Sequence, residues 1–290
     1  MIAPDRPRRS ALYLPASNPR AIEKARSIAA DVIVLDLEDA VAPEAKEAAR
    51  AAAVAAVREG GFGGREIAIR ANGLDTPWGA DDLAAIAGSG ADAVVVPKVS
   101  SPADVRACEA ALAGAPEGLQ LWAMIETCAA MGALFDLAAM APATRLSLWM
   151  IGTNDLAKEM RARLTPGREA FVPLLVQAVC AARAHGIALL DGVCNEFRDL
   201  DLFRAEAEQG LLLGFDGKTL IHPDQVGPCN EVFSPSEAEL AWARAVIAAF
   251  ALPENAGKGA IRVEGKMAEL LHLDQARRLV AIAARIAASD

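Results

Sequence analysis

Eight short apolar segments, separated by longer alanine-rich ones, constrain the fold of this chain more than any other feature. The apolar segments span residues 11–16, 32–38, 66–72, 93–99, 119–126, 146–152, 187–193 and 211–221. Between them apolar residues recur at three- and four-residue spacing, as in PEAKEAARAAAVAAVREG, which is typical of amphipathic helices. Alternating strands and helices predict a parallel sheet that is covered by helices.

The number of repeats selects the architecture. Eight strand–helix units in 290 residues predict an α/β fold of the (β/α)8 TIM barrel type, and a doubly wound open sheet is the alternative. We expect the barrel over residues 1–235 and a C-terminal helical extension over 236–290. In the extension, residues 235–250 and 267–287 predict helices, and the glycine-rich segment between them predicts irregular structure. No linker or repeat divides the chain, so we expect one domain overall.

Charge and composition narrow the classes of partner. A net charge of −9 argues against nucleic acid and anionic membrane surfaces. The longest uncharged stretch, residues 170–182, has 13 residues, which is too short to span a bilayer. No apolar segment follows the basic N-terminal residues, and the five cysteines form no C-x-x-C pair. We therefore expect a reduced, cytoplasmic protein.

Polar side chains stand where the expected strands end. They are Asp36 and Glu38 after the second strand, Arg70 after the third, Lys98 after the fourth, Glu126 after the fifth, Asp155 after the sixth, Asp191 in the seventh and Lys218 in the eighth. The functional side chains of a TIM barrel lie at the carboxyl ends of its strands. We therefore expect these acids and bases to converge on one mouth of the barrel.

The acids at this mouth predict a metal site. Asp36 and Glu38 share one face of a buried strand, where two like charges repel each other and lose hydration. A divalent cation relieves such repulsion, and carboxylate oxygens favour Mg²⁺ or Mn²⁺ over zinc. We expect Glu126 and Asp155 as metal ligands, with Asp36 and Glu38 holding metal-bound waters or orienting Arg70. A guanidinium beside a metal is suited to a carboxylate or an enolate oxygen.

Eight motifs along nearly the whole chain carry a family resemblance. They are RSALYLPASNPRAIEKA, VLDLEDAVAPEAKEAAR, IRANG, VVVPKV, MIET, GTNDLA, DGV and GKTLIHPDQV, in that order. Together they resemble the citrate lyase β-subunit-like group, with its malyl-CoA and citramalyl-CoA lyases, of the metal-dependent HpcH/HpaI aldolase superfamily. By motif, the resemblance implies Glu126 and Asp155 as metal ligands and Arg70 as the group that grips the keto acid or enolate. Asp36 and Glu38 match the acidic motif of the second strand.

The resemblance implies a Mg²⁺-dependent carbon–carbon lyase of the aldolase or Claisen type. We expect it to act on a 3-hydroxyacyl-CoA such as malyl-, citramalyl- or citryl-CoA, and to release a 2-keto acid such as glyoxylate or oxaloacetate together with an acyl-CoA. Arg9 and Lys98 are the expected contacts for the CoA portion of the substrate, although Arg9 is equally well read as a plain surface charge. A cytoplasmic homotrimer or hexamer is the expected assembly.

Four alternatives remain open from the sequence. They are a metal-dependent thioesterase, an aldolase for a free 2-keto-3-hydroxy acid, a citrate lyase β subunit that is active only in a complex, and a class I aldolase with Lys98 as its Schiff-base amine. The neighbouring acids should raise the pKa of Lys98, which disfavours the last alternative.

Two departures from the family pattern affect the expected site. The resemblance implies a catalytic aspartate in a Lys-Met-Ile-Asp sequence that reaches a neighbouring subunit, and here Glu269 takes its place in Lys-Met-Ala-Glu. Asn154 stands where many relatives have an acid. The last expected helix carries an apolar stripe that needs a surface to cover it, which predicts packing across a subunit boundary. That stripe includes Leu270, Leu273, Leu279 and Ile282.

Overall fold

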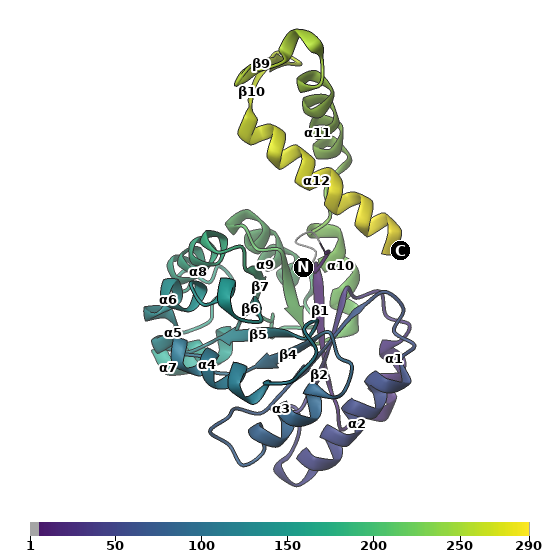
Figure 1. Cartoon of the computed structure of the whole chain (residues 1–290), viewed down its shortest axis with the longest axis vertical. Coiled ribbons are helices and arrows are strands. Elements are labelled where there is room, and N and C mark those ends of the chain that lie inside the picture. The colour runs from purple at the N-terminus through teal and green to yellow at the C-terminus, as the bar shows by residue number, and fades with distance from the viewer. Residues whose placement is uncertain (1–5, 290) are drawn as a thin grey trace. The chain divides into compact units, whose positions relative to one another are not determined.

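A computed structural model describes residues 6–289 of the chain, and the chain divides into two compact units. The unit formed by Arg8–Phe233 is a closed barrel in which the strands follow one another in chain order and β1 pairs with β8 (Figure 1). Every pair of neighbouring strands is parallel. The strands are β1 Ser10–Pro15, β2 Val32–Asp36, β3 Glu66–Arg70, β4 Ala93–Val96, β5 Gln120–Ile125, β6 Leu146–Ile151, β7 Ala188–Asp191 and β8 Gly217–Leu220. The barrel prediction is confirmed, and the open sheet is excluded.

Helices connect successive strands and surround the barrel (Figure 1). Several begin with the side-chain caps that their sequences predict: Asn18 caps α1, and Ser101 with Asp104 forms a capping box at α4. The helices of this unit are α1 Pro19–Ala25, α2 Lys46–Glu59, α3 Gly79–Ala87, α4 Pro102–Ala111, α5 Cys128–Gly132, α6 Leu134–Ala138, α7 Thr153–Met160, α8 Val172–Ala184, α9 Leu200–Leu213 and α10 Val226–Val232.

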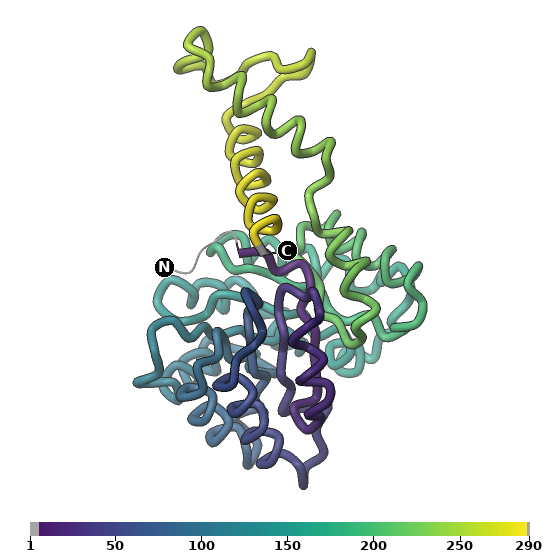
Figure 2. The backbone as a smooth tube through the Cα atoms, turned by 90° about the vertical axis from the view of Figure 1, so that its right-hand side faces the viewer, coloured from purple at the N-terminus to yellow at the C-terminus, as the bar shows by residue number. Residues whose placement is uncertain are grey.

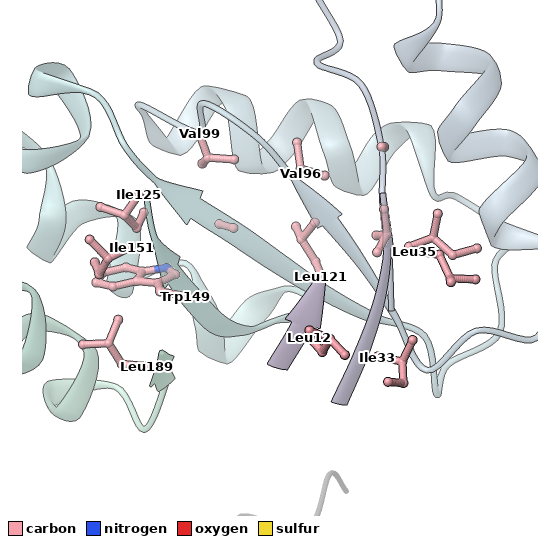
Figure 3. Packing of buried hydrophobic residues seen from close by; sticks show 14 of the residues in the cluster. Leu12, Ile33, Leu35, Val96, Val99, Leu121, Ile125, Trp149, Ile151 and Leu189 are labelled. Carbon is pink, nitrogen blue, oxygen red and sulfur yellow. The ribbon is translucent and has the colours of Figure 1, made fainter. Parts of the chain in front are cut away.

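Both faces of the sheet carry apolar side chains, and the side chains of the two faces pack in different layers of the core. Outward-facing side chains, among them Leu12, Ile33 and Leu35, pack between the strands and the helices (Figure 3). A separate cluster of strand residues, which includes Val32, Val34 and Trp122, fills the interior of the barrel. Because side chains alternate along a strand, Asp36 continues the interior face of β2 beyond Val34. The acids of the second strand therefore lie at one end of the barrel interior.

Two features of the last strands differ from the prediction. Residues 211–213 belong to the end of α9, because this helix continues until Gly214 adopts a left-handed conformation, with φ at 101°. The strand itself is shorter than residues 211–221. Asp191 and Lys218 also do not face the barrel mouth: both lie on the outer faces of β7 and β8, fully buried, where Lys218 contacts Glu206 of α9.

The second unit contains the C-terminal extension. Helix α11 Glu237–Phe250 begins with a capping box from Ser236, and α12 Leu270–Ser289 runs back after an antiparallel hairpin (Figures 1 and 2). The hairpin joins β9 Ala260–Val263 to β10 Lys266–Glu269. Irregular structure was therefore a wrong prediction for residues 260–266, and the helix begins at Leu270 instead of Met267. The two-residue turn explains the difference, since Glu264 and Gly265 both have positive φ, as this tight hairpin requires.

The apolar stripe of α12 is partly covered within its own unit. Leu273 and Ala276 are buried in a small core with Val246 of α11 and Ile261 of the hairpin. Leu270, in contrast, is 52% exposed. The stripe therefore does not by itself require a second chain, and the expected trimer or hexamer stays a prediction, as does the domain boundary at residue 235.

Within the described part of the chain, no helix combines the length and the apolar character that crossing a bilayer would require. All five cysteines are free thiols, and three of them are buried. Cytoplasmic localisation stays a prediction.

Candidate functional site

A cavity of ≈ 410 Å³ opens at the carboxyl ends of the strands, as the barrel prediction requires. Its charged lining residues come from neighbouring strands and the helix that follows β6. They are Asp36 and Asp39 at β2, Arg70 at β3, Glu126 after β5 and Asp155 in α7. The structure therefore brings together Asp36, Arg70, Glu126 and Asp155, which the sequence analysis placed at one mouth.

Arg70 is held in one orientation by two carboxylates. Its Nε and Nη2 atoms donate to the two oxygens of Asp36 at 2.7 and 2.6 Å, and its Nη1 lies 2.8 Å from Oε2 of Glu38. Burial alone would lower the pKa of Arg70, but the hydrogen bond to Asp36 and the electrostatic interactions with Tyr13, Asp36 and Glu38 together outweigh burial and raise it. The repulsion between Asp36 and Glu38 is therefore relieved by a guanidinium. Both acids contact the guanidinium that they were expected to orient, and their role in the reaction stays a prediction.

The polypeptide around Asp36 is also fixed. The oxygens of Asp36 accept the backbone N–H groups of Glu38 at 2.8 Å and Ala40 at 3.1 Å. Buried Lys46 donates to the carbonyl oxygens of Leu37 and Glu38 at 2.8 and 2.7 Å. A carboxylate that accepts several fixed donors keeps one position. The acidic segment after β2 is thus a rigid support for Arg70.

Glu126 is buried and tightly surrounded. Its Oε1 accepts the backbone N–H of Lys98 at 2.8 Å, and a Cβ atom at Gly152 would lie 2.3 Å from its Oε2. Burial, together with the negative charge of Glu38, raises the pKa of Glu126 to about 7. Glycine at position 152 is therefore what allows this carboxylate to stand against the start of α7.

Two carboxylates in the cavity have no cationic side chain as a partner among the described residues. Asp155, in the first turn of α7, makes no ion pair or hydrogen bond there, and Oε2 of Glu126 accepts no hydrogen bond. Their oxygens fit a hard divalent cation, which commonly takes one or two protein carboxylates and completes its shell with water. The described residues contain no group of three or more His, Cys, Asp or Glu side chains placed for a metal. The donor set is therefore suited to Mg²⁺ rather than to a metal that needs a closed protein cage.

Lys98 lies beside this pair, with its Nζ 3.1 Å from Oε1 of Glu38. Burial lowers the pKa of Lys98, but the charge and hydrogen bond of Glu38, together with the charges of Asp155 and Glu126, outweigh burial and raise it. A protonated amine is not a nucleophile, which counts against the Schiff-base alternative.

Arg9 does not line the cavity, and Glu269 belongs to the second unit. Arg9 is at the amino end of β1, buried, with its Nη2 2.8 Å from Asp31. Glu269 is an exposed residue of β10 in the extension. The structure therefore does not bring Arg9 to the cavity, and the proposed roles of both residues stay predictions.

Sequence reasoning missed the floor of the cavity. The ring of Tyr13 lies 4.8 Å beneath the guanidinium carbon of Arg70, and its hydroxyl lies 3.2 Å from the sulfur of Met150 and 3.8 Å from that of Met124. Burial raises the pKa of Tyr13, so the phenol stays neutral. One signal was available, because Tyr13 is the single tyrosine of the chain and lies within the first expected strand.

At the rim, Asn154 forms two reciprocal side-chain hydrogen bonds with Asn195, at 3.0 and 2.8 Å. Asn154, in the first turn of α7, therefore forms a neutral link to the segment that follows β7.

Comparisons with known proteins identify the family of the chain. The family model described as HpcH/HpaI aldolase/citrate lyase matches residues 9–223. The chain is 49% identical to a (3S)-malyl-CoA thioesterase of Cereibacter sphaeroides over 97% of this chain and 96% of the relative. It is 37% identical to an L-malyl-CoA/beta-methylmalyl-CoA lyase of the same species over 98% of this chain and 97% of the relative.

Among solved structures, the chain is similar to protein CitE from Mycobacterium tuberculosis in complex with magnesium, acetoacetate and coenzyme A. The two share 30% identity with a TM-score of 0.77, over 97% of this chain and all of CitE. The family model covers most of the chain and the relatives cover nearly all of it, which confirms the resemblance carried by the motifs. The chain is therefore an enzyme that belongs to the HpcH/HpaI aldolase/citrate lyase family.

Proposed function

We propose that this protein is a Mg²⁺-dependent enzyme that hydrolyses the thioester bond of a malyl-type 3-hydroxyacyl-CoA. One observation supports this class of substrate. Glu126 and Asp155, which form no ion pair with the described side chains, line the same cavity as Arg70, whose guanidinium is held in place by Asp36. Such a site suits a ligand that combines a metal-chelating oxygen pair with an anionic group. The 49% identity to a malyl-CoA thioesterase supports hydrolysis as the outcome.

The residues of the cavity have separate tasks in this proposal. Glu126 and Asp155 would hold Mg²⁺, which supplies Lewis acidity to the substrate oxygens when it is bound. Arg70, oriented by Asp36, places positive charge where the substrate carboxylate or a developing oxyanion lies. In hydrolysis, the oxygen of water bonds to the thioester carbonyl carbon, the carbon–sulfur bond breaks, and the sulfur leaves as the CoA thiol after it receives a proton.

Carbon–carbon cleavage, the outcome expected from the sequence, is the second candidate. The 37% identity to malyl-CoA lyases supports it, and so does Arg70, since a guanidinium suits the oxygen of an enolate. In this reaction the hydroxyl loses its proton and becomes the carbonyl of a 2-keto acid. The bond between the hydroxyl-bearing carbon and the neighbouring methylene breaks, and its electron pair passes into the thioester enolate, which is then protonated.

Product analysis separates the two reactions. The protein is incubated with (3S)-malyl-CoA and Mg²⁺, and free thiol, malate and glyoxylate are each quantified. Hydrolysis gives thiol and malate in equal amounts without glyoxylate, whereas cleavage gives glyoxylate and acetyl-CoA without free thiol. If protein that binds Mg²⁺ forms neither set of products, the malyl-type substrate is refuted.

The metal site has its own test. Glu126→Ala should lose Mg²⁺ affinity in calorimetry and lose turnover, while Glu117→Ala, which removes an exposed acid remote from the cavity, should retain both. Unchanged Mg²⁺ affinity in Glu126→Ala would reject the assignment. The Schiff-base alternative makes the opposite forecast, with activity that resists a chelator and an intermediate that borohydride traps at Lys98.

A further inference from the structure

The segment after β4 has an unusual backbone next to the cavity. Lys98 has φ at 55°, in the left-handed region that side-chain-bearing residues rarely adopt. Among the described residues, three other non-glycine residues share this property: Arg161, Arg168 and Glu264. Arg161 ends a helix and Glu264 forms a hairpin turn, which are ordinary uses of this conformation. Lys98 follows Pro97 in a turn, and positive φ in a turn usually takes glycine or asparagine, so a lysine at this position is unusual.

The left-handed backbone directs a hydrogen-bond donor at a proposed metal ligand. The N–H of Lys98 donates to Oε1 of Glu126 at 2.8 Å. The hydroxyl of Ser100 donates to the carbonyl of Lys98 at 3.0 Å and lies 2.7 Å from the hydroxyl of Thr127, the residue after Glu126. The segment after β4 is thus fastened to the segment that carries Glu126.

The side chain of the same residue reaches the other half of the site. Nζ of Lys98 lies 3.1 Å from Oε1 of Glu38, and the second oxygen of Glu38 lies 2.8 Å from Nη1 of Arg70. Glu38 is therefore shared between two cations, and burial raises its pKa. Without the ammonium, Arg70 would be the sole remaining cation in contact with the carboxylate of Glu38 among the described residues, and that carboxylate would compete more strongly with substrate for the guanidinium.

We propose that Lys98 is a positioning residue that joins the two halves of the site. Its backbone N–H orients Glu126, and its ammonium shares the charge of Glu38, so that Arg70 stays available to an anionic substrate. This inference rests on the proposed roles of Glu126 and Arg70. It differs from the expected role of Lys98 as a CoA contact, because the backbone N–H and the ammonium of Lys98 both contact acids of the site.

The two tasks belong to different parts of the residue, so substitutions separate them. Lys98→Asn removes the ammonium but tolerates the left-handed backbone, which keeps the N–H in place. Lys98→Val removes the ammonium and disfavours that backbone, because a β-branched residue with positive φ is a steric outlier. Lys98→Arg restores a cation. Calorimetry with Mg²⁺ alone reads the position of Glu126, and KM for malyl-CoA reads the availability of Arg70.

Lys98→Asn should keep the Mg²⁺ affinity of the wild type and raise KM about tenfold, with kcat changed less. Lys98→Val should in addition weaken Mg²⁺ binding about tenfold or more, as is usual when a group that supports a metal ligand is lost. Lys98→Arg should restore most of the KM. If Lys98→Val does not fold, Ser100→Ala loosens the same segment and should weaken Mg²⁺ binding in the same direction.

Each outcome decides one point. Wild-type Mg²⁺ affinity in Lys98→Val would refute the role of the N–H, and a wild-type KM in Lys98→Asn would refute the role of the ammonium. Failure of the wild-type protein itself to bind Mg²⁺ would instead refute the proposed function, so the two failures are distinguishable.

Discussion

Gly152→Ala is the substitution that tests the site most directly. The backbone at Gly152 has φ at −99° and ψ at 81°, outside the left-handed region, so alanine adds little backbone strain. The added Cβ, however, would lie 2.5 Å from Cβ and 2.3 Å from Oε2 of Glu126. Carbon atoms in contact are normally ~3.5–4.0 Å apart, so Glu126 or the start of α7 must move by about 1 Å.

The expected loss follows from this displacement. A shift of about 1 Å in a catalytic geometry costs on the order of 100-fold in rate, or ~2.7 kcal/mol of transition-state stabilisation. The bond from the N–H of Lys98 to Glu126 should weaken as well, and so should Mg²⁺ affinity. Overpacking should also lower the free energy of unfolding by ~1–3 kcal/mol.

The assay compares kcat/KM, Mg²⁺ affinity by calorimetry and urea unfolding by circular dichroism. Gly88→Ala is the matched control, because Gly88 has φ at −98° and an added Cβ there meets no atom within 4 Å. It should leave kcat/KM and Mg²⁺ affinity unchanged. Wild-type kcat/KM and Mg²⁺ affinity in Gly152→Ala would show that Glu126 is not confined as described.

Three further predictions concern other parts of the protein. Arg70→Lys should lose ~3 kcal/mol of transition-state stabilisation, measured as kcat/KM, because lysine lacks the planar guanidinium with its two parallel N–H donors. A near-normal kcat/KM would show that Arg70 has only a structural role. Burial opposes the ionisation of Asp191, but Lys218 and Arg168 together outweigh burial and lower its pKa. The ionised Asp191 therefore stabilises the fold above a pH of about 3.9, and this contribution is lost as the pH falls further. Asp191→Asn should lower the free energy of unfolding in urea by ~3–5 kcal/mol. A change within experimental error would refute the pairing of Asp191 with Lys218. Mixing Glu126→Ala with Glu269→Ala subunits should restore part of the activity if the extension serves a neighbouring chain; no recovery after demonstrated subunit exchange would exclude that arrangement.

The fold and much of the site were predictable because they depend on local patterns. Strand–helix alternation predicted the barrel, and the carboxyl ends of strands predicted where Asp36, Arg70 and Glu126 would meet. The orientation of Asp191 was not predictable, because its strand is apolar on both faces and shows no alternation to tell inside from outside. The left-handed backbone of Lys98 was hidden for another reason, since it depends on contacts with segments distant in the sequence.

The charges that line the cavity also constrain the order in which ligands enter. Four lining side chains, Asp36, Asp39, Glu126 and Asp155, are acids, and Arg70 is the single basic side chain among the lining residues that the structure describes. An anionic thioester that arrives first meets a like-charged mouth, whereas one that arrives after a divalent cation meets a neutralised one. The geometry therefore favours compulsory-order kinetics, in which free Mg²⁺ lowers the apparent KM of the thioester while the thioester alone binds weakly.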